Sequence, residues 1–206
     1  MLGGGPPARG GTKEAPVRRV VVMQSVSLDG RIAAPGGDLS WHRVDDELHR
    51  HFNDLLGAAG MFLEGRVSYE LMDEFWPTAD EDPDNPEPVR EFAAIWRDTP
   101  KVVFSRTLTS VGRGARLRRE VDPDEIRAWL AEPGGDLVVG GADLVRTFRR
   151  HGLVDEYRLY VHPVVLGAGP RMFADGDPRE ELELVETRVF GAGVVLVRCA
   201  RPPLAP

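Results

Sequence analysis

Three segments of the sequence place glycine, arginine or hydroxyl side chains where an apolar run ends. They are "LEGRVS", "VVFSRTL" and "VVGGADL". A glycine lets another molecule approach the backbone closely, and free N–H groups or a guanidinium at such a position favour an anion such as phosphate. A tight turn is the competing explanation for each glycine. The residues concerned are Gly65, Arg66 and Ser68, then Ser105 and Arg106, and finally Gly140, Gly141, Ala142 and Asp143.

A second group of residues suits the recognition of a heterocycle. Ser25 and Asp29 follow the first apolar run in "SVSLDG", and Trp41 precedes Asp46 in "SWHRVDDE". A carboxylate at a helix start beside an aromatic ring can orient a bound ring or assist its protonation. The alternative is structural, because acids in a first turn stabilise the helix dipole and Trp41 can belong to the core. These residues alone leave both interpretations open.

Other chemistries find no support in the sequence. It has no HExxH or CxxC motif and no carboxylate cluster with metal spacing, so no metal site is predicted. It has neither GxGxxG nor a Walker-type lysine, so a nucleotide would bind by another scheme. Without a GxSxG elbow, Ser25 and Ser27 are not predicted as nucleophiles. His49 and His51 are expected on different faces of a helix, and Cys199 within a strand.

The composition is that of a soluble protein with one domain. The 206 residues are 42% hydrophobic and 29% charged, which suffices for a full core. A net charge of -7 argues against nucleic acid as a partner. No apolar run approaches the roughly 20 residues that span a bilayer. One cysteine fits a reducing compartment, so a cytoplasmic location is expected. Residues 1–16 and 202–206 are predicted to be tails around a domain of residues 17–201.

Strands and helices alternate along the predicted domain. The apolar runs predict strands at 17–26, 60–65, 101–105, 115–118, 136–140, 154–167, 181–190 and 193–200. Helical spacing predicts helices at 44–59, 66–76, 89–98, 123–132 and 142–152. Asp122 is expected to cap the fourth of these helices, with Pro123 at its first position. An acidic, proline-rich loop is expected between the second and third.

This order of elements predicts a three-layer α/β sandwich. The sheet should be mostly parallel and covered on both faces, and it should end in an antiparallel C-terminal hairpin. In such sheets ligands bind beyond the carboxyl ends of the strands. The three segments with glycine, arginine and hydroxyl groups stand at those ends, so we expect them to form one site.

The segments also resemble those of a known family. "MQSVSLDGRIA", "MFLEGRVSYE", "VVFSRTL", "LVVGGADL" and "VDEYRLYVHPVVLGAGPRMF" occur in order and at suitable separations. They resemble the dihydrofolate reductase-like proteins related to the reductase domain of the bacterial riboflavin-biosynthesis deaminase/reductase. The resemblance covers residues 17–200, and its last motif is the most specific because it is not generic α/β sequence.

The resemblance implies an NADPH-dependent reductase, usually a homodimer, that transfers hydride to a pteridine- or aminopyrimidine-like small molecule. The chemistry would belong to the cofactor, and the protein would supply position and electrostatics. The residues that the resemblance assigns to the cofactor are those at its phosphates (Gly65, Arg66, Ser68), those near the 2′-phosphate (Ser105, Arg106) and those along the pyrophosphate and nicotinamide (Gly140, Gly141, Ala142, Asp143).

On the substrate side, dihydrofolate reductases carry an acid five residues after a loop tryptophan, which matches Trp41 and Asp46. Asp46 is therefore expected to orient the substrate or relay a proton, with Asp45 and Glu47 as adjacent rivals. Asp29, the second catalytic candidate, would shape the loop. Trp41 and Ser25 are expected to contact the substrate.

Two departures separate the chain from the riboflavin-pathway reductases. Val139 stands where those reductases carry a glutamate before the double glycine. "GRVSYELMDEFWP" replaces the segment that holds their substrate. The substrate therefore stays open. The sequence also leaves open the oligomeric state, the preference for NADPH over NADH and the role of the acidic loop 78–88. Two alternatives remain: a ligand-binding protein that kept the fold without turnover, and an interaction scaffold.

Overall fold

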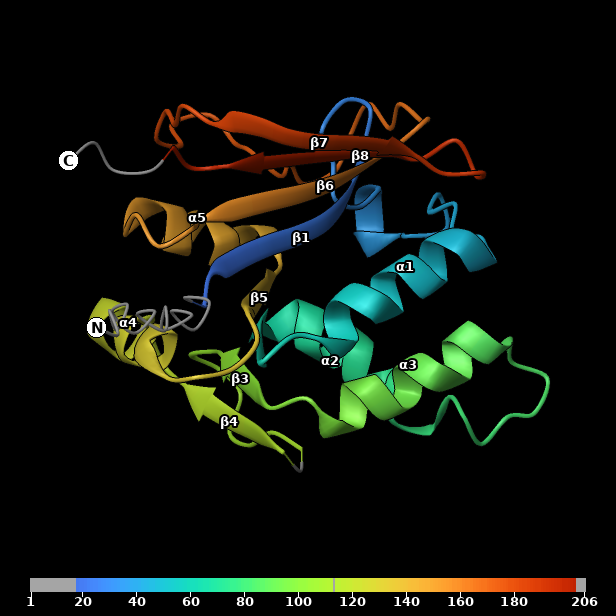
Figure 1. Ribbon diagram of the computed structural model, residues 1–206, viewed down its shortest axis with the longest axis horizontal. Helices are drawn as coiled ribbons and strands as arrows, with labels where there is room; N and C mark the ends of the chain where they lie inside the picture. The colour runs from blue at the N-terminus through green and yellow to red at the C-terminus, as the bar shows by residue number, and fades with distance from the viewer. Residues whose placement is uncertain (1–17, 113, 203–206) are drawn as a thin grey trace, which may run out of the picture.

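The computed structural model describes residues 18–112 and 114–202, and an eight-stranded sheet forms its centre (Figure 1). The strand order is β4-β3-β2-β5-β1-β6-β8-β7. Strands β1 to β6 run parallel, whereas β8 is antiparallel to β6 and β7 is antiparallel to β8. The strands are β1 Val20–Ser27, β2 Met61–Gly65, β3 Lys101–Phe104, β4 Ala115–Arg118, β5 Leu137–Gly140, β6 Glu156–His162, β7 Glu183–Val189 and β8 Val195–Ala200.

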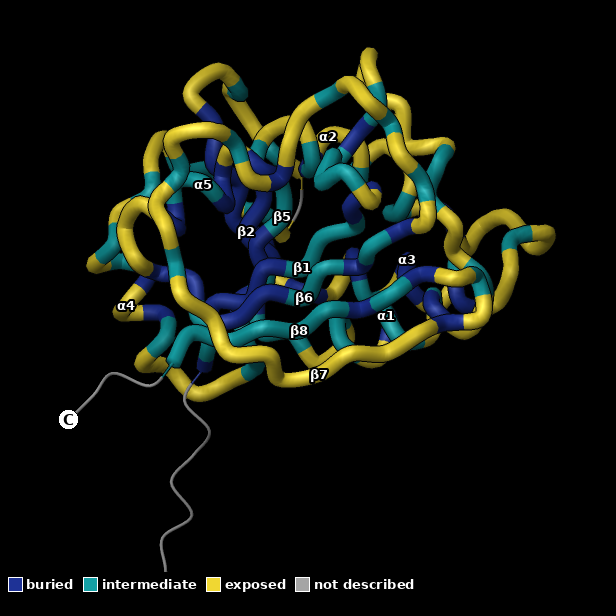
Figure 2. Tube along the Cα trace, turned by 90° about the horizontal axis from the view of Figure 1, so that it is seen from above, coloured by how far each residue is buried: buried dark blue, intermediate teal, exposed yellow. Residues whose placement is uncertain are grey.

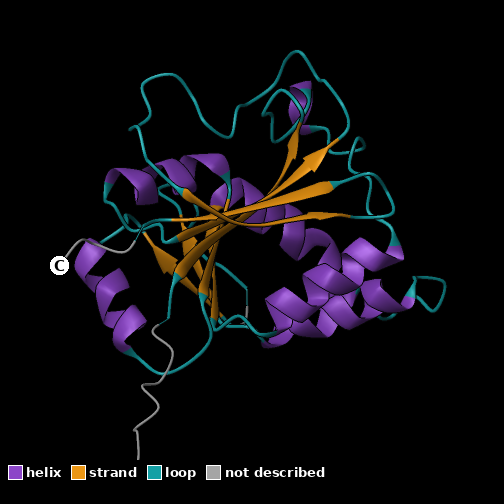
Figure 3. Cartoon of the chain, turned by 45° about the horizontal axis from the view of Figure 1, so that its top comes forward, coloured by secondary structure: helices purple, strands orange, loops and turns teal. Residues whose placement is uncertain are grey.

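Helices cover both faces of this sheet (Figure 3). Side chains of α4 and α5 belong to the buried cluster on one face, and side chains of α1, α2 and α3 belong to clusters on the other. The α-helices are α1 Asp46–Gly57, α2 Arg66–Phe75, α3 Glu87–Asp98, α4 Pro123–Ala131 and α5 Ala142–Arg150, and two short 3-10 turns are η1 Pro35–Gly37 and η2 Trp76–Thr78. The predicted fold class, an α/β sandwich with an antiparallel C-terminal hairpin, is confirmed.

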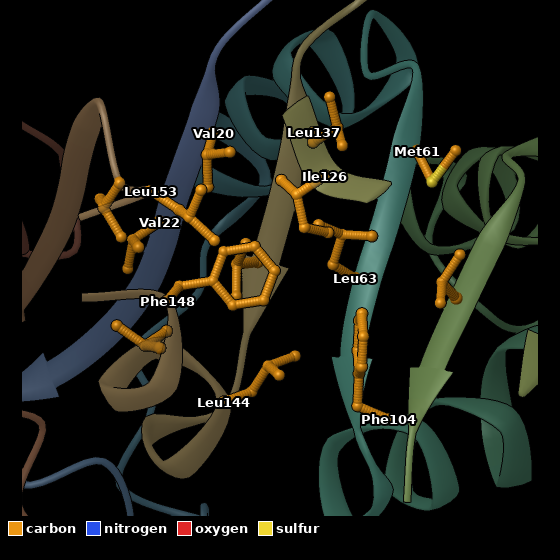
Figure 4. Close-up of a cluster of buried hydrophobic side chains, with 14 of the residues drawn as sticks. Val20, Val22, Met61, Leu63, Phe104, Ile126, Leu137, Leu144, Phe148 and Leu153 are labelled. Carbon is orange, nitrogen blue, oxygen red and sulfur yellow. The ribbon is translucent and has the colours of Figure 1, made fainter. Parts of the chain in front are cut away.

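The largest core cluster lies between the parallel strands and the helices α4 and α5 (Figure 4). Phe148 of α5 is fully buried there, among the side chains of β1, β2 and β5. Tyr157 and Tyr160 of β6 belong to different clusters, because residues three apart in a strand face opposite sides of the sheet. The edge strand β7 is exposed along its whole length (Figure 2).

Local sequence explains where two helices begin. The Asp45 carboxylate accepts a hydrogen bond from Leu48 N at 2.9 Å at the start of α1. The Asp122 carboxylate accepts from Asp124 N at 2.9 Å at the start of α4, as predicted. α3 begins at Glu87, earlier than expected, so the acidic loop is shorter than the sequence suggested. No helix among the described residues is both long and apolar enough to cross a membrane.

Candidate active site

The three segments singled out in the sequence meet at one edge of the sheet. β2 lies between β3 and β5, and register pairs Gly65 with Phe104 and Glu64 with Gly140. The carboxyl ends of these parallel strands therefore stand side by side, as the topology of such sheets requires. Two adjacent cavities open here, and they share Ser68 and Gly141 as lining residues.

The larger cavity is an open groove of about 930 Å³ over the starts of α2 and α5. All the residues predicted to bind the cofactor, except Gly140, line this groove. Its other charged residues are mostly cationic: the arginines Arg119, Arg146 and Arg171 stand against Glu120. The groove therefore suits an anionic, elongated ligand.

Not every cation in the groove is free to bind a ligand. Arg66 pairs with Glu70 at 2.7 Å, and Arg146 pairs with Asp143 at 3.0 Å. Arg119 donates to the backbone oxygens of the loop after β3. Arg106, in contrast, is exposed and forms no hydrogen bond or ion pair with any described residue. The Arg171 side chain is likewise exposed and has no such partner, so we regard Arg106 and Arg171 as the guanidiniums most available to an anion.

Ser105 has a structural task at the same place. Its hydroxyl oxygen accepts from Leu108 N at 3.0 Å and from Thr107 N at 3.2 Å, and the residue is only 7% exposed. This pattern is a serine turn that fixes the loop after β3. Ser105 thus holds Arg106 in position at the groove.

Steric contacts within the chain explain why the two residues at the end of β5 are glycines. A Cβ on Gly140 would lie 2.8 Å from Oε2 of Glu64, and one on Gly141 would lie 2.7 Å from Oγ of Ser68. Gly141 also has a φ of +90°, which L side chains rarely adopt. The alternative of a tight turn is therefore supported, and close approach of a cofactor to these glycines stays a prediction.

The smaller cavity, which we call the chamber, has a volume of about 270 Å³, lies between the sheet and helices α1, α2 and α3, and is about as open to solvent as the groove. Most of its wall is apolar or aromatic. The polar groups on the wall are Gln24, Ser25, His42, Glu64 and Ser68. No residue of the acidic loop 78–88 lines the chamber or the groove.

Glu64 is the acid of this chamber, and it is not among the candidate residues predicted from the sequence. It is 9% exposed, and its carboxyl forms no hydrogen bond with any described residue. Burial raises the pKa of Glu64 to about 8, although the nearby Lys101 ammonium opposes that rise. The carboxyl is therefore mostly protonated at neutral pH. The available signal was an acid inside the otherwise apolar strand "MFLEG".

Two histidines stand beside the chamber. His162 is fully buried, and its Nδ1 accepts from Arg43 N at 3.0 Å. Burial lowers the pKa of His162 to about 4, so the ring is neutral and carries its proton on Nε2. The ring stacks on His42 at 5.2 Å between centroids, and His42 lines the chamber. Neither histidine was predicted from the sequence as a site residue.

The residues predicted for the substrate side are not brought together. Ser25 lines the chamber. Trp41 and Asp46 line neither cavity. The Trp41 ring packs against the His42 ring, with centroids 4.2 Å apart, and its Nε1 donates to the backbone oxygen of Asp38 at 3.1 Å. Asp46 is exposed and pairs with Arg50 at 3.5 Å. Asp46 therefore does not lie where a catalytic role would require it, beside a ligand in the chamber or the groove.

Asp29 connects two loops and also lies outside both cavities. Its carboxylate accepts from the backbone N–H groups of Leu166 and Gly167, each at 3.0 Å, and from the Ser27 hydroxyl at 2.7 Å. These hydrogen bonds hold the pKa of Asp29 well below its usual range. The expectation that Asp29 shapes its loop agrees with this geometry, whereas proton transfer by Asp29 has no support from it.

No group of three His, Cys, Asp or Glu side chains in the described part of the chain could hold a metal ion.

The chain belongs to the RibD C-terminal domain family, whose model matches residues 18–196. It is 36% identical over 181 residues to the uncharacterized protein YyaP of Bacillus subtilis (strain 168), covering 87% of this chain and 93% of YyaP. It is 27% identical over 186 residues to the uncharacterized protein YwjB of the same organism, covering 87% and 96%. The family relationship expected from the sequence is confirmed, and it indicates a reductase-like protein.

Solved structures share the fold. A protein of Shewanella sp. PV-4, provisionally described as a riboflavin biosynthesis protein, matches with a TM-score of 0.69 and 22% identity, covering 90% of this chain and 99% of that one. A pyrimidine reductase-like protein of Corynebacterium diphtheriae NCTC matches with a TM-score of 0.59 and 13% identity, covering 89% and 91%. A deaminase/reductase of Thermotoga maritima, whose name gives phosphoribosylaminopyrimidines as its substrates, matches with a TM-score of 0.60 and 17% identity. The match covers 90% of this chain and 57% of that one.

Proposed function

We propose that this protein is a reductase that binds NADPH in the groove and reduces a small heterocycle in the chamber. The observation that carries the proposal is that the groove and the chamber share Ser68 and Gly141. An elongated ligand in the groove therefore ends beside the place where a small ring can lie. The family relationship supports a reductase, and a bound reduced nicotinamide would supply the hydride.

The residues of the groove fit the charge of a dinucleotide phosphate. Arg106 offers a guanidinium with no described partner, and Arg171 adds another cation to the lining. The first N–H groups of α5 lack helical acceptors and point toward the groove end of the helix. Gly65, Arg66, Ala142 and Asp143 complete the wall, as the family resemblance implies.

We assign the preference for the 2′-phosphate to Arg106. A charge-assisted hydrogen bond contributes about 1.5–3 kcal/mol. Arg106→Ala is therefore expected to weaken NADPH binding by roughly 10- to 100-fold and to leave NADH binding nearly unchanged. Arg90→Ala is a matched control, because Arg90 is also exposed but lines neither cavity.

The measurement is a titration of both nicotinamide cofactors, followed by tryptophan fluorescence because Trp96 lines the chamber. Saturable binding that prefers NADPH, lost in Arg106→Ala but not in Arg90→Ala, would support the proposal. Binding without oxidation of NADPH by any pteridine, flavin or quinone would instead favour a ligand-binding protein without turnover. Absence of binding to the wild-type protein would refute the cofactor assignment.

We also infer a homodimer, which the family resemblance implies. The edge strand β7 leaves apolar side chains in solvent, with Leu184 65% exposed and Val189 70% exposed. An unpaired apolar edge favours association with another chain. Sedimentation equilibrium of the wild-type protein and of Leu184→Lys tests this: a monomer in both would refute it.

A further inference from the structure

The chamber wall carries little charge. Among the described residues that line it, none is arginine or lysine, and burial lowers the pKa of its histidine, His42. A phosphate placed there would lose its hydration without gaining a cation, which is unfavourable. The cations of the site lie instead in the groove, on the far side of Ser68 and Gly141. The chamber is therefore suited to an uncharged ligand.

The chamber is small and its wall is aromatic. Its volume of about 270 Å³ lies below the usual range for drug-sized ligands, about 300–1,000 Å³. Phe62 and Trp96, two of the rings that line it, stack on each other at 5.8 Å between centroids with 19° between their planes. Phe52, Phe92 and Tyr160 contribute further rings to the lining. A flat ligand of one or two fused rings matches this size and wall.

The position of Glu64 gives this wall one strong hydrogen-bonding group. Glu64 precedes the turn into α2, opposite Gly140 on β5. Because Gly140 has no side chain, the carboxyl occupies the space beside it, within 2.8 Å of where a Cβ would be. Gln24 and Ser25 of β1 lie on the same wall. A nearly buried carboxyl without a partner in the described residues leaves hydrogen-bonding capacity that a ligand in the chamber can satisfy.

Resting on the proposed reductase function, we propose that the chamber binds a flat, uncharged nitrogen heterocycle that carries no phosphate. Glu64 anchors this ring by donating one hydrogen bond and accepting another at an N–H/C=O edge of the ring. Glu64 is thus a substrate-binding residue, in the place for which the sequence had suggested Asp46.

Several titratable groups surround the Glu64 carboxyl. Lys101 of β3 opposes the rise in its pKa, and Lys101 is held by the backbone oxygens of Trp96 and Thr99. His42 and Tyr160 face the same chamber, and burial lowers the pKa of His42 and raises that of Tyr160, so both are neutral near pH 7. A protonated Glu64 can donate to a neutral ring, whereas the ionised form cannot. Binding of the ring should therefore weaken as the pH rises through about 8.

The experiment uses the full-length protein saturated with NADP⁺, which prevents turnover. Isothermal titration calorimetry compares 6-hydroxymethylpterin with its monophosphate, two probes that differ only in the phosphate. We expect the unphosphorylated pterin to bind at least tenfold more tightly. Glu64→Ala should weaken its binding at least tenfold. Glu64→Gln, whose amide both donates and accepts, should retain it. Glu74→Gln is the control, because Glu74 is exposed on α2 and lines neither cavity.

The pH dependence separates a hydrogen-bonding role from a merely structural one. Between pH 7 and pH 9 the protonated fraction of an acid with a pKa of about 8 falls roughly tenfold. Pterin affinity of the wild-type protein should fall by about that factor relative to Glu64→Gln, since titration of the probe affects both proteins alike. Infrared difference spectroscopy should show the carbonyl band of a protonated carboxyl at pH 7 in the wild-type protein and not in Glu64→Gln.

Three results would overturn the inference. The first is equal or tighter binding of the monophosphate, and the second is an affinity ratio between the two proteins that does not change with pH. The third is no binding of either probe to a protein that does bind NADP⁺. Failure to bind any nicotinamide cofactor would refute the proposed function instead. In that event the pterin titrations and the infrared band, measured without cofactor, still decide the role of Glu64.

Discussion

The contact between Glu64 and Gly140 predicts an unusual reversal of a mutational effect. In Gly140→Ala the new Cβ would lie 2.8 Å from Oε2 and 3.2 Å from Oε1 of Glu64, closer than ordinary van der Waals contact. Overpacking of this kind costs about 1–3 kcal/mol. Gly140 does not have a positive φ, so alanine there also gains about 0.5–1 kcal/mol over glycine in a strand. The net expectation is a loss of about 0–2.5 kcal/mol in the free energy of unfolding.

The same substitution should be favourable once the carboxyl is gone. In a Glu64→Ala background the new methyl group meets no carboxyl, so Gly140→Ala should stabilise the protein by about 0.5–1 kcal/mol. The assay is urea unfolding of the four proteins in the double-mutant cycle, with the slope of each transition checked for constancy. Gly57→Ala is the control, because its Cβ would lie at an ordinary 3.5 Å from Cδ1 of Ile95 and should behave alike in both backgrounds.

The effect of Gly140→Ala on stability, compared with and without the Glu64 carboxyl, tests whether the two residues are in contact. If Gly140→Ala destabilises the protein equally with and without the Glu64 carboxyl, the two residues do not touch. The steric account of Gly140 would then be wrong, and so would the placement of Glu64 in the chamber wall. A reversal of sign would show that Gly140 is needed to accommodate an acid, independently of any cofactor.

Two further predictions concern pH and a loop. The folded state holds the pKa of His162 at about 4, below its unfolded value, so protonation favours unfolding. The free energy of unfolding should therefore fall as the pH drops from about 6.5 toward 4. Urea titrations at several pH values should show a smaller fall in His162→Phe. An unchanged dependence on pH in this variant would refute the lowered pKa of His162. Asp29→Asn should speed hydrogen exchange of the Leu166 and Gly167 amides while leaving cofactor affinity unchanged, and lost affinity with normal exchange would restore a direct role at the site.

Much of the fold follows from local patterns in the sequence. Short apolar runs such as "KVVF" and "LVVG" predict buried parallel strands, and both form interior strands of the sheet, with a neighbour on each side. The pair Asp122 and Pro123 marks the start of α4 because each residue has a specific backbone preference there. The start of α3 was misplaced because prolines were taken as loop formers. Pro88 lies in the first turn of α3, where proline needs no backbone donor.

The cofactor side of the site could be predicted better than the substrate side for a topological reason. Residues that directly follow parallel strands meet at one sheet edge whenever the strands are neighbours, so their position depends on few assumptions. Asp46 depends instead on the rotation of α1. Leu48 is fully buried and faces the sheet, and a residue two positions earlier in a helix points about 200° away, toward solvent.

Glu64 could not be predicted as a site residue because a strand pattern does not show which elements cover each face of the sheet. "MFLEG" is a continuous apolar run with one acid, and in β2 the alternation puts Glu64 on the same face as Phe62. Only the packing of α2 and α3 over that face turns the position into a chamber wall, and only the pairing of β2 with β5 puts Gly140 opposite. The double glycine thus acquires two physical roles that the sequence could not separate. Gly140 admits the carboxyl to the chamber, and Gly141 provides the backbone turn at the boundary between chamber and groove.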